Sequence, residues 1–501
     1  MGANTTGTDN TAIGTGALLS STTGSSNVAV GRLALTANTT ADNNTAVGHN
    51  SLAANTTGTR NTAVGMNALD ANTTADDNTA VGQGALSSNT TGHSNTAVGR
   101  SSLNVNTTGT GNVSVGAYAL DASNSNNNVA IGIYAASATT SGDNLVAVGR
   151  YALKENTTGS GNVAVGLNAM EMNTTASNNT AMGTQALEAN TTASNNTALG
   201  YNALKANTTG ANNVAVGSYA LDADDAQAGC VAIGFEAFTR LTSGNHNLAI
   251  GYQAGDHYTS TTDTTIIGYS AATAGTTGEC NTIVGSHAFV TATTAANSTG
   301  MGHAALNAVT TGNNNTAVGR LALLVATTGS NNTALGYGAG EQLTTGSNNL
   351  FLGYEAGTGS SPNQVATGSN AIVMGNNSIS SCHIKVDWTV TSDRRDKTDI
   401  EPFNHGLSWI NKLNPVTYRW DNRSFYDDGK PDGSKKQSQL NLGLIAQDEI
   451  EVEKEHGYGD TPDNMLISHL GEDGNYGMQY SKLVPILINA VKELSAEVEQ
   501  L

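Results

Sequence analysis

The chain has 40 acidic side chains, which are groups that could carry out chemistry. Hydrolysis of a glycan would require two carboxylates held at a fixed separation. The acidic residues of the repetitive part instead occupy variable positions between short predicted strands, where solvated turns are expected. These residues are Asp42, Asp70, Asp76, Asp77, Asp121 and Glu155. Their placement argues against a glycan hydrolase and indicates exposed turn residues.

The cysteines and basic residues give no recognisable binding site either. Cys230, Cys280 and Cys382 lie far apart without CxxC or Cys/His spacing, so we expect small buried side chains and no metal or cofactor. A formal net charge of −19, with 21 lysines and arginines in 501 residues, argues against a nucleic-acid partner. No apolar run approaches the roughly 18 residues of a membrane span, and the first residues lack a signal-peptide pattern. Membrane insertion is therefore not expected.

One repeating motif, N-[TVL]-A-[VILM]-G, sets the elements that position these side chains. The glycine that closes the motif recurs at a constant interval, the one from Gly14 to Gly31, as far as Gly353. Only the step to Gly132 is one residue shorter. A wider step to Gly375 ends the series. This fixed period, with 58 glycines and only 5% aromatic residues, is typical of a solenoid rather than of a globular enzyme.

Each repeat combines a short strand with a turn. In the unit that contains Gly48, Thr45 and Val47 flank Ala46, which predicts a strand with one apolar face. The NTTG or NTTA that follows supplies turn residues, because asparagine and glycine tolerate left-handed backbone. Roughly 21 such coils, about 4.8 Å apart, predict a β-solenoid rod on the order of 100 Å long.

A single coil of threonine, alanine and valine buries little surface, so we expect three chains to share a core. Leu52 is the candidate for their common axis. The NTAVG units between positions 10 and 375 are similar to the repeats of trimeric autotransporter adhesin heads, although the spacing here is longer. This resemblance implies a left-handed parallel β-roll in a three-chain bundle.

The composition changes after Gly375, where charges increase and Trp409 and Trp420 appear, which indicates a separate domain. SWINKL predicts a short helix that Pro415 ends, VTYRW predicts a strand, and GLIAQ begins a second helix. Apolar residues near the end follow the 4, 3, 4, 3 spacing of a coiled-coil seam: Leu487, Val491, Leu494, Val498 and Leu501. The predicted fold is therefore mainly β, a β-solenoid shaft followed by a small α+β domain that ends in a coiled-coil helix.

The blocks SDRRDKTDI, LNPVTYRW and GLIAQ, in this order, resemble the peptidase S74 family, the intramolecular chaperone of endosialidases and of many phage tail fibres and spikes. The resemblance spans roughly residues 390–501. It implies a homotrimer in which this domain helps the shaft fold in register and then cuts itself off. We therefore divide the chain into a shaft (1–377), a connector (378–391) and the chaperone (392–501).

The resemblance also implies the residues of a single-turnover autoprotease without an external substrate. The family's serine corresponds to Ser392 and its lysine to Lys397, so the cleaved bond would be Thr391–Ser392. A lysine whose pKa is lowered by burial can act as general base for such a hydroxyl.

Further residues match the same motif and would have supporting roles: Asp393, Arg394 and Asp399. Asp396 lies where an apolar residue is more usual in that family, and its carboxylate would favour charged lysine and slow the cut. The alternative interpretation is that Ser392 and Asp393 only cap a turn.

Together these features predict a homotrimeric phage tail fibre or spike, made in the host cytoplasm and located in the virion. Its expected partners are a host-cell surface receptor, either a glycan or an outer-surface protein, and a virion adaptor or baseplate protein. The irregular coils between Gly217 and Gly300 predict receptor contacts at Tyr252, His257 and Tyr258. Two other classes stay open: a trimeric bacterial surface adhesin, which would need export and a membrane anchor, and an ice-binding solenoid, which would need a flat threonine array.

Overall fold

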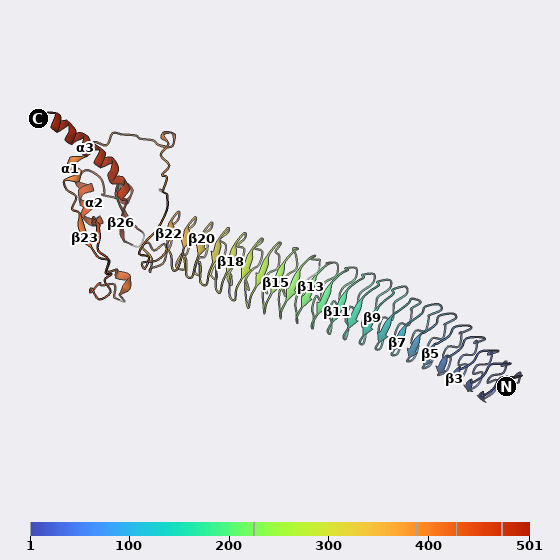
Figure 1. Cartoon of the computed structure of the whole chain (residues 1–501). Coiled ribbons are helices and arrows are strands. Elements are labelled where there is room, and N and C mark those ends of the chain that lie inside the picture. The colour runs from blue at the N-terminus through green and yellow to red at the C-terminus, as the bar shows by residue number, and fades with distance from the viewer. Residues whose placement is uncertain (1, 224–225, 387, 427, 472–473, 501) are drawn as a thin grey trace. The chain divides into compact units, whose positions relative to one another are not determined.

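The computed structural model describes residues 2–223, 226–386, 388–426, 428–471 and 474–500. The chain forms two compact units, Met1–Ala304 and Ala305–Leu501. Three-residue parallel strands make up the regular structure of the first unit, and the same strands recur at the start of the second unit (Figure 1). Helices and two small antiparallel sheets follow.

Every strand of the repeat lies directly before a closing glycine. The strands of the first unit are β1 Thr11–Ile13, β2 Val28–Val30, β3 Thr45–Val47, β4 Thr62–Val64, β5 Thr79–Val81, β6 Thr96–Val98, β7 Val113–Val115, β8 Val129–Ile131, β9 Val146–Val148, β10 Val163–Val165, β11 Thr180–Met182, β12 Thr197–Leu199, β13 Val214–Val216, β14 Val231–Ile233, β15 Leu248–Ile250, β16 Thr265–Ile267, β17 Thr282–Val284 and β18 Thr299–Met301. Those of the second unit are β19 Thr316–Val318, β20 Thr333–Leu335, β21 Leu350–Leu352 and β22 Ile372–Met374.

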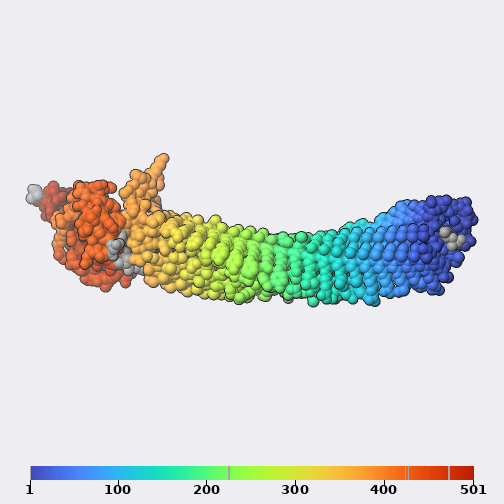
Figure 2. All heavy atoms as spheres, turned by 90° about the horizontal axis from the view of Figure 1, so that it is seen from below, coloured from blue at the N-terminus to red at the C-terminus, as the bar shows by residue number. Residues whose placement is uncertain are grey.

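Successive strands pair in parallel and in register. Ala46 pairs with Ala63 and Val47 with Val64, so each residue lies over its counterpart one repeat later. In the first unit the coils pack closely on one another, as the blue to green part of Figure 2 shows. The structure confirms a mainly β fold with a β-solenoid of 17-residue repeats.

The apolar face of each strand points out of the coil, and the alanine between points in. Ala46 is fully buried, whereas Thr45 and Val47 on either side of it are partly exposed. In the next coil Val64 is 37% exposed. The middle residue of the strand therefore lies in the interior of the coil, together with larger side chains such as Leu52, and a row of apolar side chains remains on the outside.

The prediction that Leu52 marks a three-chain axis is wrong, because this side chain lies inside its own coil. Leu52 is 0% exposed in the single chain and has a left-handed backbone with φ 49°. The left-handed conformation costs about 1–2 kcal/mol for a residue with a side chain. Full burial of a leucine contributes about 1.5–3 kcal/mol, which offsets that cost.

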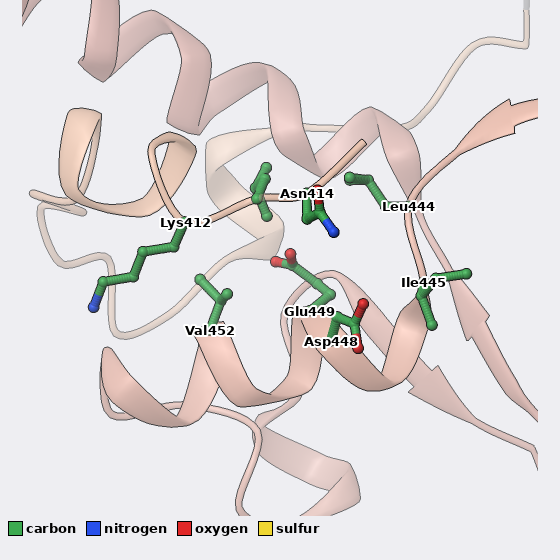
Figure 3. A pocket seen from close by; sticks show the side chains of 8 residues that line it. Lys412, Asn414, Leu444, Ile445, Asp448, Glu449 and Val452 are labelled. Carbon is green, nitrogen blue, oxygen red and sulfur yellow. The ribbon is translucent and has the colours of Figure 1, made fainter. Parts of the chain in front are cut away.

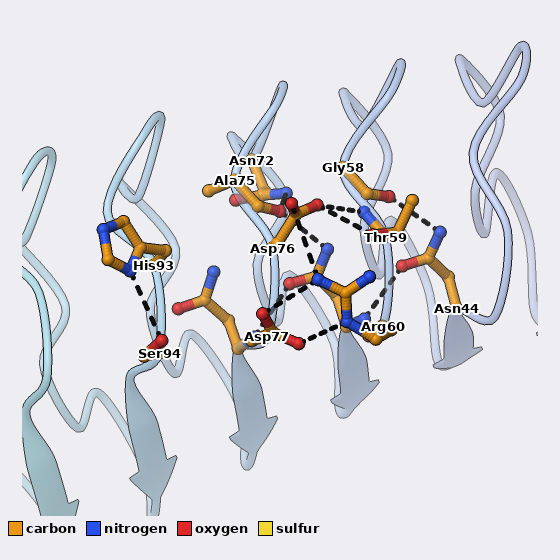
Figure 4. A network of polar contacts seen from close by, with 12 residues as sticks. Asn44, Gly58, Thr59, Arg60, Asn72, Ala75, Asp76, Asp77, His93 and Ser94 are labelled. Atoms are coloured by element: carbon orange, nitrogen blue, oxygen red, sulfur yellow. Dashed lines mark hydrogen bonds and ion pairs between the residues drawn. The ribbon is translucent and has the colours of Figure 1, made fainter.

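Two rows of buried asparagines connect the coils. In the first row, Asn44 Nδ2 donates to the carbonyl oxygen of Gly58 at 2.8 Å, and Asn44 Oδ1 accepts from the backbone N–H of Asn61 at 2.9 Å (Figure 4). In the second row, most asparagine amides donate to the asparagine one coil earlier, as Asn72 does to Asn55 at 2.8 Å. These side chains satisfy buried polar groups that a single coil leaves open.

The closing glycine is required by the close stacking of the coils. A Cβ on Gly48 would lie 2.5 Å from the carbonyl oxygen of Gly65, and the φ of Gly48 is 137°. No residue with a side chain fits both the contact and the dihedral angle.

The α+β part of the second unit packs around Trp409. Its helices are α1 Leu407–Ile410, α2 Ala446–Glu455 and α3 Leu483–Glu499, with 3₁₀ turns at Arg394–Asp396, Arg423–Phe425, Pro462–Asn464 and Tyr480–Lys482. Strands β23 Val416–Tyr418 and β24 Asn441–Gly443 form one antiparallel pair, and β25 Ser468–Leu470 and β26 Tyr476–Met478 form another. The core residues are Trp409, Val452, Ile467 and Ile486. None of the described helices has the length and apolar composition that a bilayer span requires.

Replacing a ladder asparagine should loosen the coils on either side of it. Asn72→Ala removes the donor to Asn55 and the acceptor for Asn89, and we expect a loss of about 1–3 kcal/mol in the local free energy of opening. Hydrogen exchange of the backbone amides in these coils measures this loss. The exposed Thr74→Ala in the same coil is the control, and equal exchange in both variants would contradict the role of the ladder.

Candidate functional site

The structure brings Ser392 and Lys397 together. Lys397 Nζ donates to Ser392 Oγ at 2.5 Å, although the two residues are five positions apart. The 3₁₀ turn Arg394–Asp396 lies between them and reverses the chain, and the backbone N–H of Lys397 donates to the carbonyl oxygen of Arg394. Both side chains are exposed.

Asp393 begins this turn and is its cap. Its carboxylate accepts from the backbone N–H of Arg395 at 2.9 Å and pairs with the Arg395 guanidinium at 2.6 Å. These hydrogen bonds from Arg395 lower the pKa of Asp393. The capping interpretation is therefore correct for Asp393, and the cap is what presents Lys397 to Ser392.

The remaining residues of the motif lie at the edge of this turn. Arg394 contributes its backbone carbonyl, while its neighbour Arg395, which the motif did not single out, forms the ion pair. Asp399 follows with a left-handed backbone of φ 50°, and Asp396 is exposed. The geometry can transfer a proton from the serine hydroxyl to the lysine amine once that amine is neutral.

Two buried glutamates on α2 hold the core of the α+β part together. Glu453 is 0% exposed and accepts from the backbone N–H groups of Leu466, Ile467 and Ser468 at 2.7–2.9 Å. Glu449 accepts from Trp409 Nε1 at 2.9 Å. Sequence reasoning missed both, because an acidic residue on a helix with many charges predicts an exposed position.

Glu449 faces a small pocket in which one of its oxygens has no hydrogen-bond partner among the described residues (Figure 3). The pocket has a volume of about 10 Å³, enough for one water molecule. Burial raises the pKa of Glu449 to about 7. Across the described residues, no group of three or more histidine, cysteine or acidic side chains is placed to hold a metal ion.

Helix α3 presents the predicted coiled-coil seam to the outside. Leu487, Val491, Leu494 and Val498 are 46–66% exposed, whereas Ile486 and Ala490 on a neighbouring face of the helix are buried. Leu501 lies outside the described residues. Between the seam positions, Asn489 donates to the carbonyl oxygen of Phe403 at 2.5 Å, and Glu493 accepts from the backbone N–H of Leu407, the first residue of α1, at 2.6 Å. These contacts fix the helix to its own domain.

The three predicted receptor residues differ in accessibility. Tyr252 is 43% exposed and stacks between Phe235 and Tyr269, with ring centroids 5.4 and 5.3 Å apart. His257 is exposed and lies 3.3 Å from Asp256. Tyr258 is fully buried, so its prediction as a receptor contact is wrong. Its ring fills the interior over Gly275, where a Cβ would lie 2.0 Å from it.

Residues 392–458 match the family model Peptidase_S74, described as the chaperone of endosialidase. The chain carries a peptidase S74 domain. The match begins at Ser392, and the domain follows a long β-solenoid, an order typical of phage tail fibres and spikes. Membership of this family implies a homotrimer. No curated protein and no solved structure matches the chain.

Glu449→Gln should remove a pH-dependent loss of stability from the S74 domain. Because the pKa of Glu449 is raised from its usual 4.5 to about 7, the folded state retains a proton that the unfolded state releases. The contribution of Glu449 to the free energy of unfolding is then fully present below about pH 4.5, and it is lost as the pH rises through about 7.

Thermal unfolding at about pH 5 and pH 8 measures this effect. We expect wild type to lose more stability than Glu449→Gln between the two conditions. Glu451→Gln, at an exposed position of the same helix, serves as control and should follow wild type. Parallel pH profiles for wild type and Glu449→Gln would show that the buried carboxyl does not titrate in this range.

Proposed function

We propose that this chain is the shaft of a homotrimeric phage tail fibre or spike, located in the virion and used for attachment to the host. Its S74 domain drives trimerisation and folding of the shaft and then cuts the chain at Thr391–Ser392. The observation that carries this proposal is the family match that begins at Ser392, after a long β-solenoid.

The contact between Lys397 and Ser392 supports a direct route for the cut. The neutral lysine amine takes the proton of Ser392 Oγ, and this oxygen attacks the carbonyl carbon of Thr391. The amide nitrogen of Ser392 leaves with a proton returned by the lysine, so the Thr391 acyl group passes to Ser392 Oγ as an ester. Water then hydrolyses the ester and leaves a carboxylate on Thr391 and a free amine on Ser392.

The site is exposed in the single chain, which indicates that the cut depends on assembly of the trimer. A lysine becomes a general base when burial disfavours its charged form, and nearby carboxylates oppose this change. Asp393 and Asp396 are such carboxylates, and Ser392 and Lys397 are both open to solvent. We infer that packing of three S74 domains covers the site and starts the reaction.

The outside of the solenoid offers a surface for the three-chain shaft, which we call the outer strand row. It consists of the first and third residues of β1–β18, which are Thr, Val or Leu and Val, Ile, Leu or Met, respectively, in every coil. None is charged. At about 4.8 Å per strand the row is roughly 80 Å long, and with a width of about 10 Å it supplies roughly 800 Å² per chain. A stable interface needs about that area on each side.

Ser392→Ala should abolish the cut, because no hydroxyl remains beside the Thr391 carbonyl. Lys397→Arg should do the same, since a guanidinium keeps its proton. Mass spectrometry of the expressed chains should find a fragment that begins at Ser392 in wild type and in the control Ser381→Ala. The same fragment in Ser392→Ala would remove the proposed nucleophile.

Charges placed in the outer strand row should prevent the shaft from trimerising. Val64→Asp with Val81→Asp would bring like charges of three chains together in an apolar contact. Thr57→Asp with Thr74→Asp adds the same charge at exposed turn positions of neighbouring coils and is the control. Sedimentation of the shafts should give trimers for wild type and control only. A trimeric Val64/Val81 variant would place the interface elsewhere.

A further inference from the structure

The connector before the S74 domain carries a strand pattern that the single chain does not use. From His383 to Thr391 polar and apolar residues alternate, and the apolar members are Ile384, Val386, Trp388 and Val390. Alternation of β-branched and aromatic residues with polar ones predicts a strand with one apolar face. The described residues of this stretch nevertheless form no strand or helix.

The apolar side chains of this stretch are among the most exposed of the chain. Ile384 is 54% exposed, Val386 75%, Trp388 72% and Val390 80%. Exposed apolar side chains that gather in one short segment are typical of an interaction site.

We propose that residues 383–391 become a strand in the assembled fibre and pack its apolar face against the same strand of two further copies of this chain. We call this segment the clamp. The inference rests on the proposed homotrimer and its cut.

The position of the segment in the sequence favours other copies of this chain as its binding partner. The clamp lies in sequence between the outer strand row and the α3 seam, both of which present uncharged apolar residues for contact with other copies. Three identical strands would join identical apolar faces around an axis. Polar side chains such as Lys385 would then point to water.

The position of the proposed cut indicates what the clamp does. Cleavage after Thr391 removes α3 with its seam and leaves the clamp as the last residues of the shaft. Chain ends open first when no contact holds them. The clamp therefore keeps the three shafts closed at this end after the S74 domain has left.

Trp388 reports on the clamp directly, because the other two of the three tryptophans, Trp409 and Trp420, lie beyond the cut. Fluorescence of the purified released shaft should show blue-shifted emission and at least about fivefold weaker quenching by acrylamide than the unfolded shaft, since the indole is buried. Emission and quenching of a solvent-exposed indole in a trimeric shaft would overturn the clamp.

Cross-linking tests the same arrangement in a chain that is not cut. Cys382 is an exposed free thiol one residue before the clamp. In a Cys280→Ser variant, a short bis-maleimide should join Cys382 residues of two chains into dimers that survive denaturation. A trimeric protein in which Cys382 reacts with the reagent without forming dimers would overturn the proposal.

Two variants, one on each face of the strand, test which face contacts the other copies. Val386→Asp should make the released trimeric shaft dissociate at least about tenfold faster in detergent, and Lys385→Asp on the polar face should leave the rate unchanged. Equal dissociation of both variants would overturn the clamp while the homotrimer stands. A wild-type chain that sediments as a monomer would instead overturn the homotrimer and the clamp together.

Discussion

The hydrogen bonds that cross from one coil of the solenoid to the next are the interaction on which the rest of the shaft depends. A coil pairs some of its own carbonyl groups, as Asn55 Nδ2 does with Gly58 at 2.9 Å, but its three-residue strand forms its ladder with neighbouring coils. The first asparagine row adds to these bonds, because each side chain donates to a carbonyl group and accepts from the next asparagine backbone, as Asn44 does with Gly58 and Asn61. In most coils the partners return to the same place after 17 residues.

The one shortened coil affects the two asparagine rows differently. Between Gly116 and Gly132 the interval is 16 residues, yet Asn128 still donates its backbone N–H to Asn112 Oδ1 at 3.0 Å. The second row breaks at this coil: Ser123 stands where the next asparagine would be, and Asn106 Oδ1 has no hydrogen-bond partner among the described residues. The first row is interrupted elsewhere, where Leu145, Cys230, Thr264 and Ser298 replace its asparagine and still donate their backbone N–H groups to the preceding asparagine. Single asparagines of either row can therefore be replaced, and the second row is replaced over a longer stretch. Farther along, its position is apolar and equally buried, at Leu241, Tyr258, Val309 and Leu343.

The strands, the closing glycines and the stacking of coils could be predicted from the sequence, because their constraint recurs in every unit. The inside and outside of the coil could not. Hydrophobicity favours Val47 over Ala46 as a clue to the core, but the strand turns Val47 to the outside and buries the alanine. Tyr258 was mistaken for a surface residue because an aromatic residue in an irregular coil looks like a binding residue, whereas it fills the space over Gly275. The motif placed Ser392 and Lys397 correctly near each other, while buried Glu449 left no signal in the sequence.

The regularity of the repeat also explains why a shaft of this kind would need a separate domain to set the register of its three chains, and why that domain can later be removed. Neighbouring coils carry almost the same outer strand row, so three chains displaced by one repeat would bury nearly the same apolar surface. The contacts between the outer strand rows do not distinguish such a displaced arrangement from the correct one. The predicted seam of α3 occurs once in the chain and has no equivalent one coil away. Under the proposed function, joining three chains at α3 before the coils stack fixes the register, and the stacked coils then preserve it without the domain that set it.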